Sequence, residues 1–179
     1  MAPTPIQENL VNSNKTYAAS FTQGNLALPP AKNMQSVRLP DPIVTCMDTR
    51  IDPAAAYGIS LGDAHVIRNA GGNARDALRS LVISQQLLGT QEIILIKHTG
   101  CGMLTFESND AVGIVRNNLG EEAAAELAAF KEEFQAFPDL EAAVKDDVEF
   151  LKESKLIPDS ITISGWVYEV ETGKVRTVV

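Results

Sequence analysis

The sequence has few residues that could form disulfide cross-links, and it lacks the long apolar segments typical of secreted or membrane proteins. Only two cysteines and two histidines occur among its 179 residues, and two cysteines are too few for a disulfide scaffold. No stretch reaches the roughly 18 consecutive apolar residues of a membrane span, and the N-terminal segment lacks the apolar run of a signal peptide. We therefore expect a cytoplasmic protein, in which two thiols more often serve as metal ligands or catalytic groups than as a disulfide.

Positive charge is also scarce. Lys and Arg number 15 against 23 acidic residues, so that the formal net charge is −8. Such a chain repels phosphate backbones and anionic lipid headgroups, and we expect neither a nucleic acid nor a membrane as partner. Ten of the acids and only two lysines lie in residues 121–149. The excess of negative charge is thus local, and we interpret it as the solvated face of one helical segment.

The chain divides at about residue 42. Residues 1–41 are polar and dotted with prolines, apart from a possible helix over residues 8–21. Such a segment cannot bury enough apolar surface to fold alone, so it is either disordered or laid across a partner subunit. We interpret it as an arm that packs on a partner subunit. The remainder, 42–179, carries the patterned sequence of a single domain with a hydrophobic core.

Strand and helix patterns alternate along residues 42–179. Apolar runs that stop at polar loops predict buried strands at 42–46, 65–68 and 92–97. Helical spacing of apolar residues predicts helices over 73–88 and 140–151, and a closing hairpin is expected over 160–179. The predicted fold class is α/β, with an open and mostly parallel sheet flanked by helices, an antiparallel C-terminal strand and an N-terminal helical arm.

Both cysteines follow predicted strands. In open parallel sheets, ligands bind outside the carboxyl ends of the strands, where Cys46, His98 and Cys101 are expected. Two thiolates and one imidazole suit zinc, and a set of three leaves the fourth position that a catalytic zinc keeps for water. Each residue alone has a simpler interpretation, a small core cysteine or a hydrogen-bonded histidine. Their joint position at strand ends favours a metal site.

Further polar groups and glycines accompany these three residues. Asp48 and Arg50 follow Cys46 closely enough to form a bidentate ion pair. On a surface this pair would contribute little, but beside a metal Asp48 can accept a proton from bound water, or instead close the site as a fourth ligand. Gly102 has no side chain and would let a backbone N–H approach a substrate oxygen. We interpret His65 as structural.

Three blocks of the sequence resemble the signature motifs of the β-class carbonic anhydrases. They occur in the family's order, and the resemblance extends from about Pro42 to the C-terminus: Cys46-Met-Asp-Thr-Arg50, Gly62-Asp-Ala-His-Val-Ile-Arg-Asn-Ala-Gly-Gly72 and His98-Thr-Gly-Cys-Gly102. The resemblance implies one zinc ion per chain held by Cys46, His98 and Cys101, with Asp48 and Arg50 as a catalytic dyad. It also implies a homodimer whose N-terminal helices cross over the partner, or a tetramer built from such dimers.

The sequence departs from the family pattern in two places. Thr49 stands where the commonest block has serine, and Gly72 replaces a frequent asparagine. The chain is short, like a compact branch of the family in which carbonyl sulfide hydrolases are also found. Because CO2 hydration is the commoner activity in the resembled family, we expect hydration of CO2 to bicarbonate by a metal-bound hydroxide, with carbonyl sulfide as the alternative small neutral gas substrate. Met103, Leu104 and Phe106 are candidates for the pocket wall.

Two hypotheses without this chemistry remain. A catalytically silent zinc-binding assembly protein would keep the fold and the metal, although it would have no use for the Asp48 and Arg50 pair. A thiol oxidoreductase would use both cysteines, but the chain has no Cys-x-x-Cys pair and 55 positions separate Cys46 from Cys101. The metal content of the purified protein separates the second hypothesis from the others.

Overall fold

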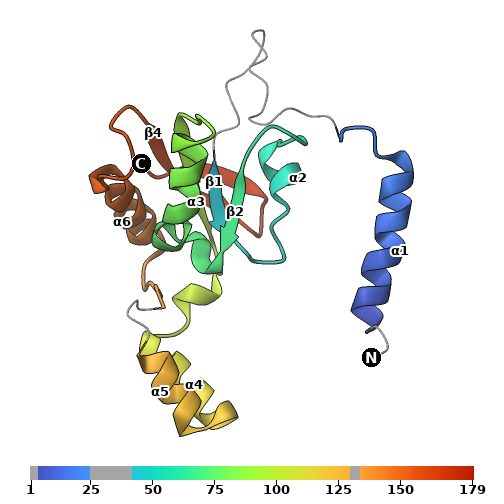
Figure 1. Cartoon of the computed structure of the whole chain (residues 1–179). Coiled ribbons are helices and arrows are strands. Elements are labelled where there is room, and N and C mark those ends of the chain that lie inside the picture. The colour runs from blue at the N-terminus through green and yellow to red at the C-terminus, as the bar shows by residue number, and fades with distance from the viewer. Residues whose placement is uncertain (1–3, 25–41, 130–133) are drawn as a thin grey trace.

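A single five-stranded sheet organises the protein. The computed structural model describes residues 4–24, 42–129 and 134–179. Their strands lie in the order β2-β1-β3-β4-β5, in which β5 alone runs antiparallel to its neighbour. The bounds are β1 (Ile43–Cys46), β2 (Val66–Asn69), β3 (Glu92–His98), β4 (Thr162–Glu169) and β5 (Lys174–Thr177). This arrangement, visible in Figure 1, confirms the predicted α/β class.

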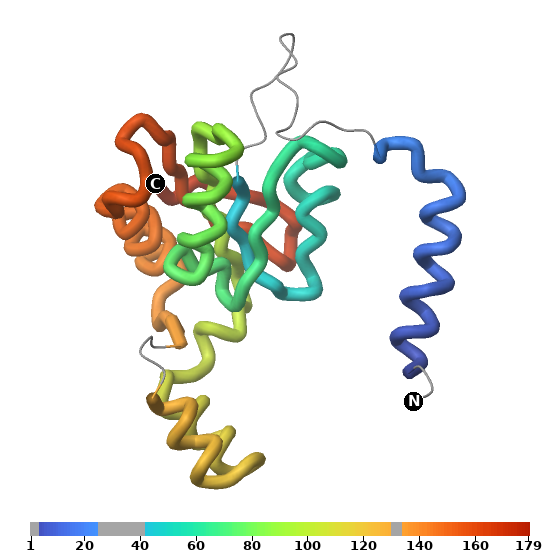
Figure 2. The backbone as a smooth tube through the Cα atoms, in the orientation of Figure 1, coloured from blue at the N-terminus to red at the C-terminus, as the bar shows by residue number. Residues whose placement is uncertain are grey.

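The helices surround this sheet and extend from it. They are α1 (Pro5–Ser20), α2 (Pro53–Tyr57), α3 (Ala74–Gln86), α4 (Ser108–Leu119), α5 (Glu121–Ala128) and α6 (Leu140–Glu153), with short 3₁₀ turns at Ala70–Gly72 and Gly102–Leu104. Figure 2 shows α3 and α6 beside the sheet, and the α4 and α5 pair projecting from it. No helix in the described ranges is long and apolar enough to cross a membrane.

Alternate residues of the central strands pack on opposite faces of the sheet. Val44 and Leu95 face Leu81 of α3 and the apolar side of α6, where they form the larger hydrophobic core. Ile43 and Ile96 point the other way and pack in a second cluster that includes residues of α2. Because both faces are covered, the continuous apolar run of β3 is confirmed as a buried central strand.

Helix α1 makes no buried contact in the described chain. Thr4 caps its first turn in a reciprocal pair of hydrogen bonds with Gln7. All its residues are exposed, including Ile6 at 82% and Leu10 at 67%, and the helix lies apart from the sheet in Figure 1. The helix expected in the arm is thus present. Residues 1–3 and 25–41 of the arm lie outside the described residues.

The acidic region differs from the single solvated helix that its composition predicted. Its described residues form two helices, α5 and α6, and residues 130–133 between them lie outside the described ranges. One of the acids, Asp147, is only 7% exposed and pairs with Lys97 of β3. The interpretation as a solvated face is therefore wrong for Asp147, because a buried cation on the neighbouring strand compensates its charge.

Candidate metal centre

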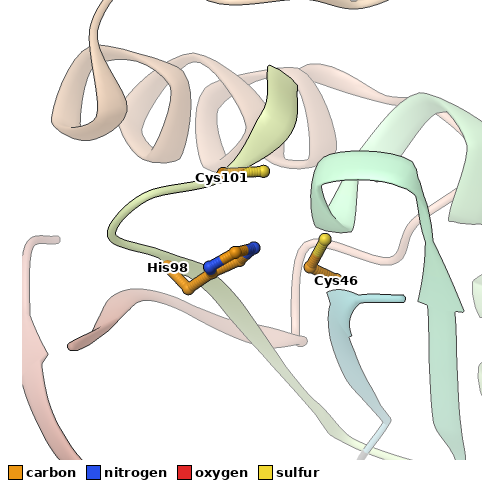
Figure 3. Close-up of side chains that lie close together, drawn as sticks. All are labelled: Cys46, His98 and Cys101. Atoms are coloured by element: carbon orange, nitrogen blue, oxygen red, sulfur yellow. The ribbon is translucent and has the colours of Figure 1, made fainter. Parts of the chain in front are cut away.

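Cys46, His98 and Cys101 converge at one edge of the sheet. Cys46 is the last residue of β1 and His98 the last residue of β3, and the loop after β3 brings Cys101 back toward both. All three are buried, and their ligand atoms lie within 4.8 Å of one another. Figure 3 shows the two sulfur atoms and the imidazole ring directed toward a shared space. The spatial cluster expected from the sequence is therefore present.

The donor atoms of this cluster suit a metal ion. Nδ1 of His98 lies 2.9 Å from the Thr99 carbonyl oxygen, and since a carbonyl only accepts, Nδ1 must donate its proton there. The lone pair of the imidazole is then on Nε2, which is buried and has no hydrogen-bond partner in the described structure. An unpartnered buried nitrogen beside two sulfurs is the donor set that zinc prefers. The three residues could hold a metal ion.

The two thiols share their protons unequally. The Cys101 thiol donates a hydrogen bond to the Cys46 sulfur, and this bond lowers the pKa of Cys46 to about 4 although burial opposes the shift. The neighbouring His98 side chain and the backbone amides of Asp48 and Gly71 lower it further. The same hydrogen bond between the thiols, together with burial, raises the pKa of Cys101. Burial alone would lower the pKa of His98, but the neighbouring Cys46 thiolate outweighs burial and raises it. A negative charge is thus favoured on Cys46.

The predicted pair of Asp48 and Arg50 forms beside this cluster. The Arg50 guanidinium donates from Nε and Nη2 to the two Asp48 oxygens, at 2.9 and 2.7 Å, and its backbone amide also donates to Asp48. These bonds hold the pKa of the Asp48 carboxyl well below its usual range. Oδ2 of Asp48 lies 3.8 Å from Nε2 of His98. The carboxylate therefore borders the space between the ligand atoms.

Two further groups fix the loops after β1 and β3, and sequence reasoning assigned no role to them. Arg68, at the end of β2, donates to the backbone oxygens of Cys46 at 3.1 Å and Asp48 at 2.7 Å. Thr99 donates to Glu171 at 2.7 Å and accepts from the Val170 amide at 3.0 Å. The available signal was the place of Arg68 at a strand end next to Cys46, since a cation there can satisfy loop carbonyls.

The remaining candidates differ in their relation to the cluster. Gly102 begins a 3₁₀ turn and has open space where a side chain would be, so its proposed amide contact stays a prediction. Met103 packs in the same hydrophobic cluster as Cys46 and Cys101, with Leu104 and Phe106 at its margin. His65 hydrogen-bonds Ser84 at 2.8 Å, before the start of β2 and so away from the carboxyl edge, in accord with its structural interpretation.

Comparisons with known proteins agree with this arrangement. A family model described as carbonic anhydrase matches residues 42–175. The β-carbonic anhydrase 1 of Mycobacterium tuberculosis is 36% identical over 174 residues, covering 97% of this chain and 98% of that protein. A carbon disulfide hydrolase of Saccharolobus solfataricus is 40% identical over 152 residues, covering 75% of this chain and 74% of that protein. The solved structure of a carbonic anhydrase from Glaciozyma antarctica superposes with a TM-score of 0.88 at 46% identity, covering 99% of this chain and 100% of that one.

The shifted thiol pKa values predict one thiolate per chain in protein stripped of metal by a chelator. Thiolate absorbance in the ultraviolet should be present at neutral pH and should disappear as the pH falls through about 4, the pKa of Cys46. Cys46→Ser should abolish this signal. Cys101→Ala should move its midpoint to higher pH, because the largest stabilising bond is lost. Absorbance that first emerges near the ordinary thiol pKa of about 8.5 would contradict the prediction.

Proposed function

The chain belongs to the carbonic anhydrase family, and we propose that it hydrates CO2 to bicarbonate as a β-class member. One observation carries the proposal: two buried thiols and an imidazole nitrogen converge within 4.8 Å beside an ionised carboxylate. A structural metal site normally has four protein ligands, whereas a catalytic site has three and admits water. The retained Asp48 and Arg50 pair supports catalysis over a silent assembly role.

We assign the metal ligands to Cys46, His98 and Cys101, with one zinc ion per chain. Bound there, zinc supplies a Lewis acid that lowers the pKa of a coordinated water molecule. The Thr99 carbonyl fixes the His98 ring in the tautomer that leaves Nε2 free for the ion. Arg68 holds the Cys46 backbone from the neighbouring strand. These contacts position the donors before any ion is bound.

The Asp48 carboxylate is the group that orients water, by accepting a hydrogen bond from it. Its depressed pKa keeps it ionised across the neutral range, so that it acts as a hydrogen-bond acceptor. Arg50 engages both of its oxygens and itself donates to the Gly100 carbonyl at 2.9 Å. This clamp supports a role for Asp48 as an acceptor rather than as a fourth metal ligand, because both oxygens already have a cationic partner.

The substrate of this proposal is small, linear and uncharged. The hydrophobic cluster that contains Cys46, Cys101 and Met103 supplies apolar surface beside the ligands, which suits CO2 better than a charged molecule. We place the exposed backbone amide of Gly102 near a substrate oxygen, where it can donate a hydrogen bond as negative charge develops. Bicarbonate would then leave toward the solvent-exposed Arg50 side.

A second candidate function is hydrolysis of the sulfur analogues of CO2. The likeness to a carbon disulfide hydrolase at 40% identity favours it, and carbonyl sulfide is the intermediate analogue with one sulfur. The same residues could support either reaction, since attack at the central carbon is common to all three gases. We rank CO2 first because the β-carbonic anhydrase relative covers nearly the whole chain, whereas the carbon disulfide hydrolase covers three quarters of it.

We further propose that the protein acts in the cytoplasm as a homodimer or as a tetramer of dimers. The two buried free thiols are suited to a reducing compartment. The exposed apolar side chains of α1, among them Ile6 and Leu10, do not pack into either hydrophobic cluster of the described chain and suit contact with another subunit. In this proposal residues 1–41 form the arm and residues 42–179 the catalytic domain.

The role of Asp48 is tested by Asp48→Asn, which keeps its shape and removes its charge. CO2 hydration by the zinc-loaded protein should fall about 100-fold or more, while zinc content stays at one ion per chain. Asp63→Asn is the matched control, because Asp63 also accepts a loop amide, from Ser60 at 2.8 Å, but belongs to another loop. Full activity of Asp48→Asn, or zinc-loaded parent protein without turnover, would contradict the proposed mechanism.

Substrate preference is tested by comparing the gases on one zinc-loaded sample. We expect turnover of CO2 to exceed that of carbonyl sulfide and carbon disulfide, measured by proton release for CO2 and by hydrogen sulfide production for the other two. Protein treated with a chelator serves as the blank and should recover its activity with zinc. Faster hydrolysis of either sulfur compound would reverse the order of the two candidate functions.

The arm is tested by deleting residues 1–33. Light scattering should show weaker subunit association, because the exposed apolar side chains of α1 are lost, while thermal unfolding of the remaining chain should change less. A full-length Lys15→Glu variant, altered on the same helix at a polar position, is the control and should associate as the parent does. A truncated chain that remains fully dimeric at low concentration would refute the proposed role of the arm in subunit association.

A further inference from the structure

Lys97 is a buried cation that the proposed chemistry does not use. It precedes His98 on β3, so its side chain leaves the opposite face of the sheet. The side chain is 1% exposed, and Nζ lies 2.8 Å from Oδ2 of Asp147 on α6. The same Asp147 oxygen accepts the Ala74 amide at 3.1 Å, at the start of α3. The pair thus joins β3, α6 and α3.

The Lys97 ammonium also binds the turn between β2 and α3. Nζ donates to the carbonyl oxygens of Gly71 at 3.1 Å and Gly72 at 3.3 Å. Together with Asp147, these oxygens account for the three donor protons of the ammonium. The ring of Phe137 lies over Nζ with its centroid 4.8 Å away. Lys97 therefore fixes both turn carbonyls with all its protons engaged.

The turn that Lys97 holds touches the proposed ligand Cys46. Gly71 and Gly72 have positive φ values of 75° and 59°, a conformation that favours glycine. The space where a Gly72 side chain would begin lies only 3.1 Å from the Cys46 amide nitrogen. The Gly71 amide is also among the groups that lower the pKa of the Cys46 thiol. The turn thus receives the lysine on its two carbonyls and packs against the main chain of Cys46.

Stability alone gives little reason for this arrangement. A buried ion pair costs about as much to desolvate as its attraction returns, and an apolar pair of similar volume is often at least as stabilising. Apolar neighbours are at hand, since Leu95, two residues earlier on the same strand, and Val148, next to Asp147, belong to the larger hydrophobic core. The feature that an apolar side chain could not reproduce is the grip on the two turn carbonyls.

We propose that Lys97 is a positioning residue for the metal ligand Cys46. By holding the Gly71 and Gly72 carbonyls, it fixes the turn that packs against the main chain of Cys46, and so holds the Cys46 sulfur in position for the ion. Asp147 balances the charge of this buried cation and does not itself contact the turn carbonyls. The inference rests on the proposed metal site, and it adds a residue that fixes the position of one of the three ligands.

The test compares two variants of the full chain loaded with Co²⁺ in place of zinc. Lys97→Met/Asp147→Asn removes the grip on the turn without leaving a buried charge, and asparagine can still accept the Ala74 amide. Asp147→Asn alone leaves Lys97 to hold both carbonyls. The double variant should bind Co²⁺ about 10- to 100-fold more weakly and shift the thiolate-to-cobalt charge-transfer band. Asp147→Asn should keep the spectrum of the parent protein.

Val148→Ala controls for loss of stability alone, since it removes core contacts beside Asp147 and should lower the melting temperature without moving the band. If Lys97→Met/Asp147→Asn does not fold, Lys97→Gln/Asp147→Asn replaces it. The same weaker Co²⁺ binding and band shift are expected, because the glutamine side chain is one bond shorter than lysine and cannot reach both turn carbonyls. An unchanged band in the folded double variant, or an equal shift in Val148→Ala, would overturn the inference. Parent protein that binds no Co²⁺ or zinc would instead refute the proposed metal site.

Discussion

The parallel pairing of β1 with β3 is the interaction on which the candidate site depends. Its register places Ile43 opposite Ile94 and Thr45 opposite Ile96, so that the two strands end at the same edge one or two residues later. The hydrogen bonds of this ladder are buried in the middle of the sheet, where no water competes for them. Cys46 and His98, from distant parts of the chain, therefore meet at one edge, and the loop after β3 brings Cys101 to them.

Two adjacent residues of β3, on opposite faces of the sheet, have different roles. His98 turns its ring toward the two sulfurs, and Lys97 turns its ammonium toward α6 and the turn before α3. Because successive side chains of a strand point in opposite directions, neither residue can take the place of the other. A shift of one position in the register would exchange a ligand for a cation and abolish both arrangements.

Much of this organisation could be predicted from the sequence because it is local. The apolar run 92–97 and the polar residues that follow it mark both a buried strand and its functional end, and the short spacing of Asp48 and Arg50 already implies their pair. The contact of Lys97 with Asp147 could not be predicted, since 50 positions separate them and the acid lies in a strongly acidic stretch. Its burial is a consequence of how α6 packs on the sheet, which periodicity alone does not fix.

Gly72 shows how little tolerance such packing leaves. A first side-chain carbon there would lie 3.0 Å from the Thr45 carbonyl carbon, 3.1 Å from the Cys46 nitrogen and 3.2 Å from the Ile96 oxygen. All three neighbours are main-chain atoms, which cannot rotate aside as a flexible side chain can. A single added methyl group at this position would therefore require the turn or the ends of the two central strands to move by a few tenths of an ångström, close to the residue that we assign as a metal ligand.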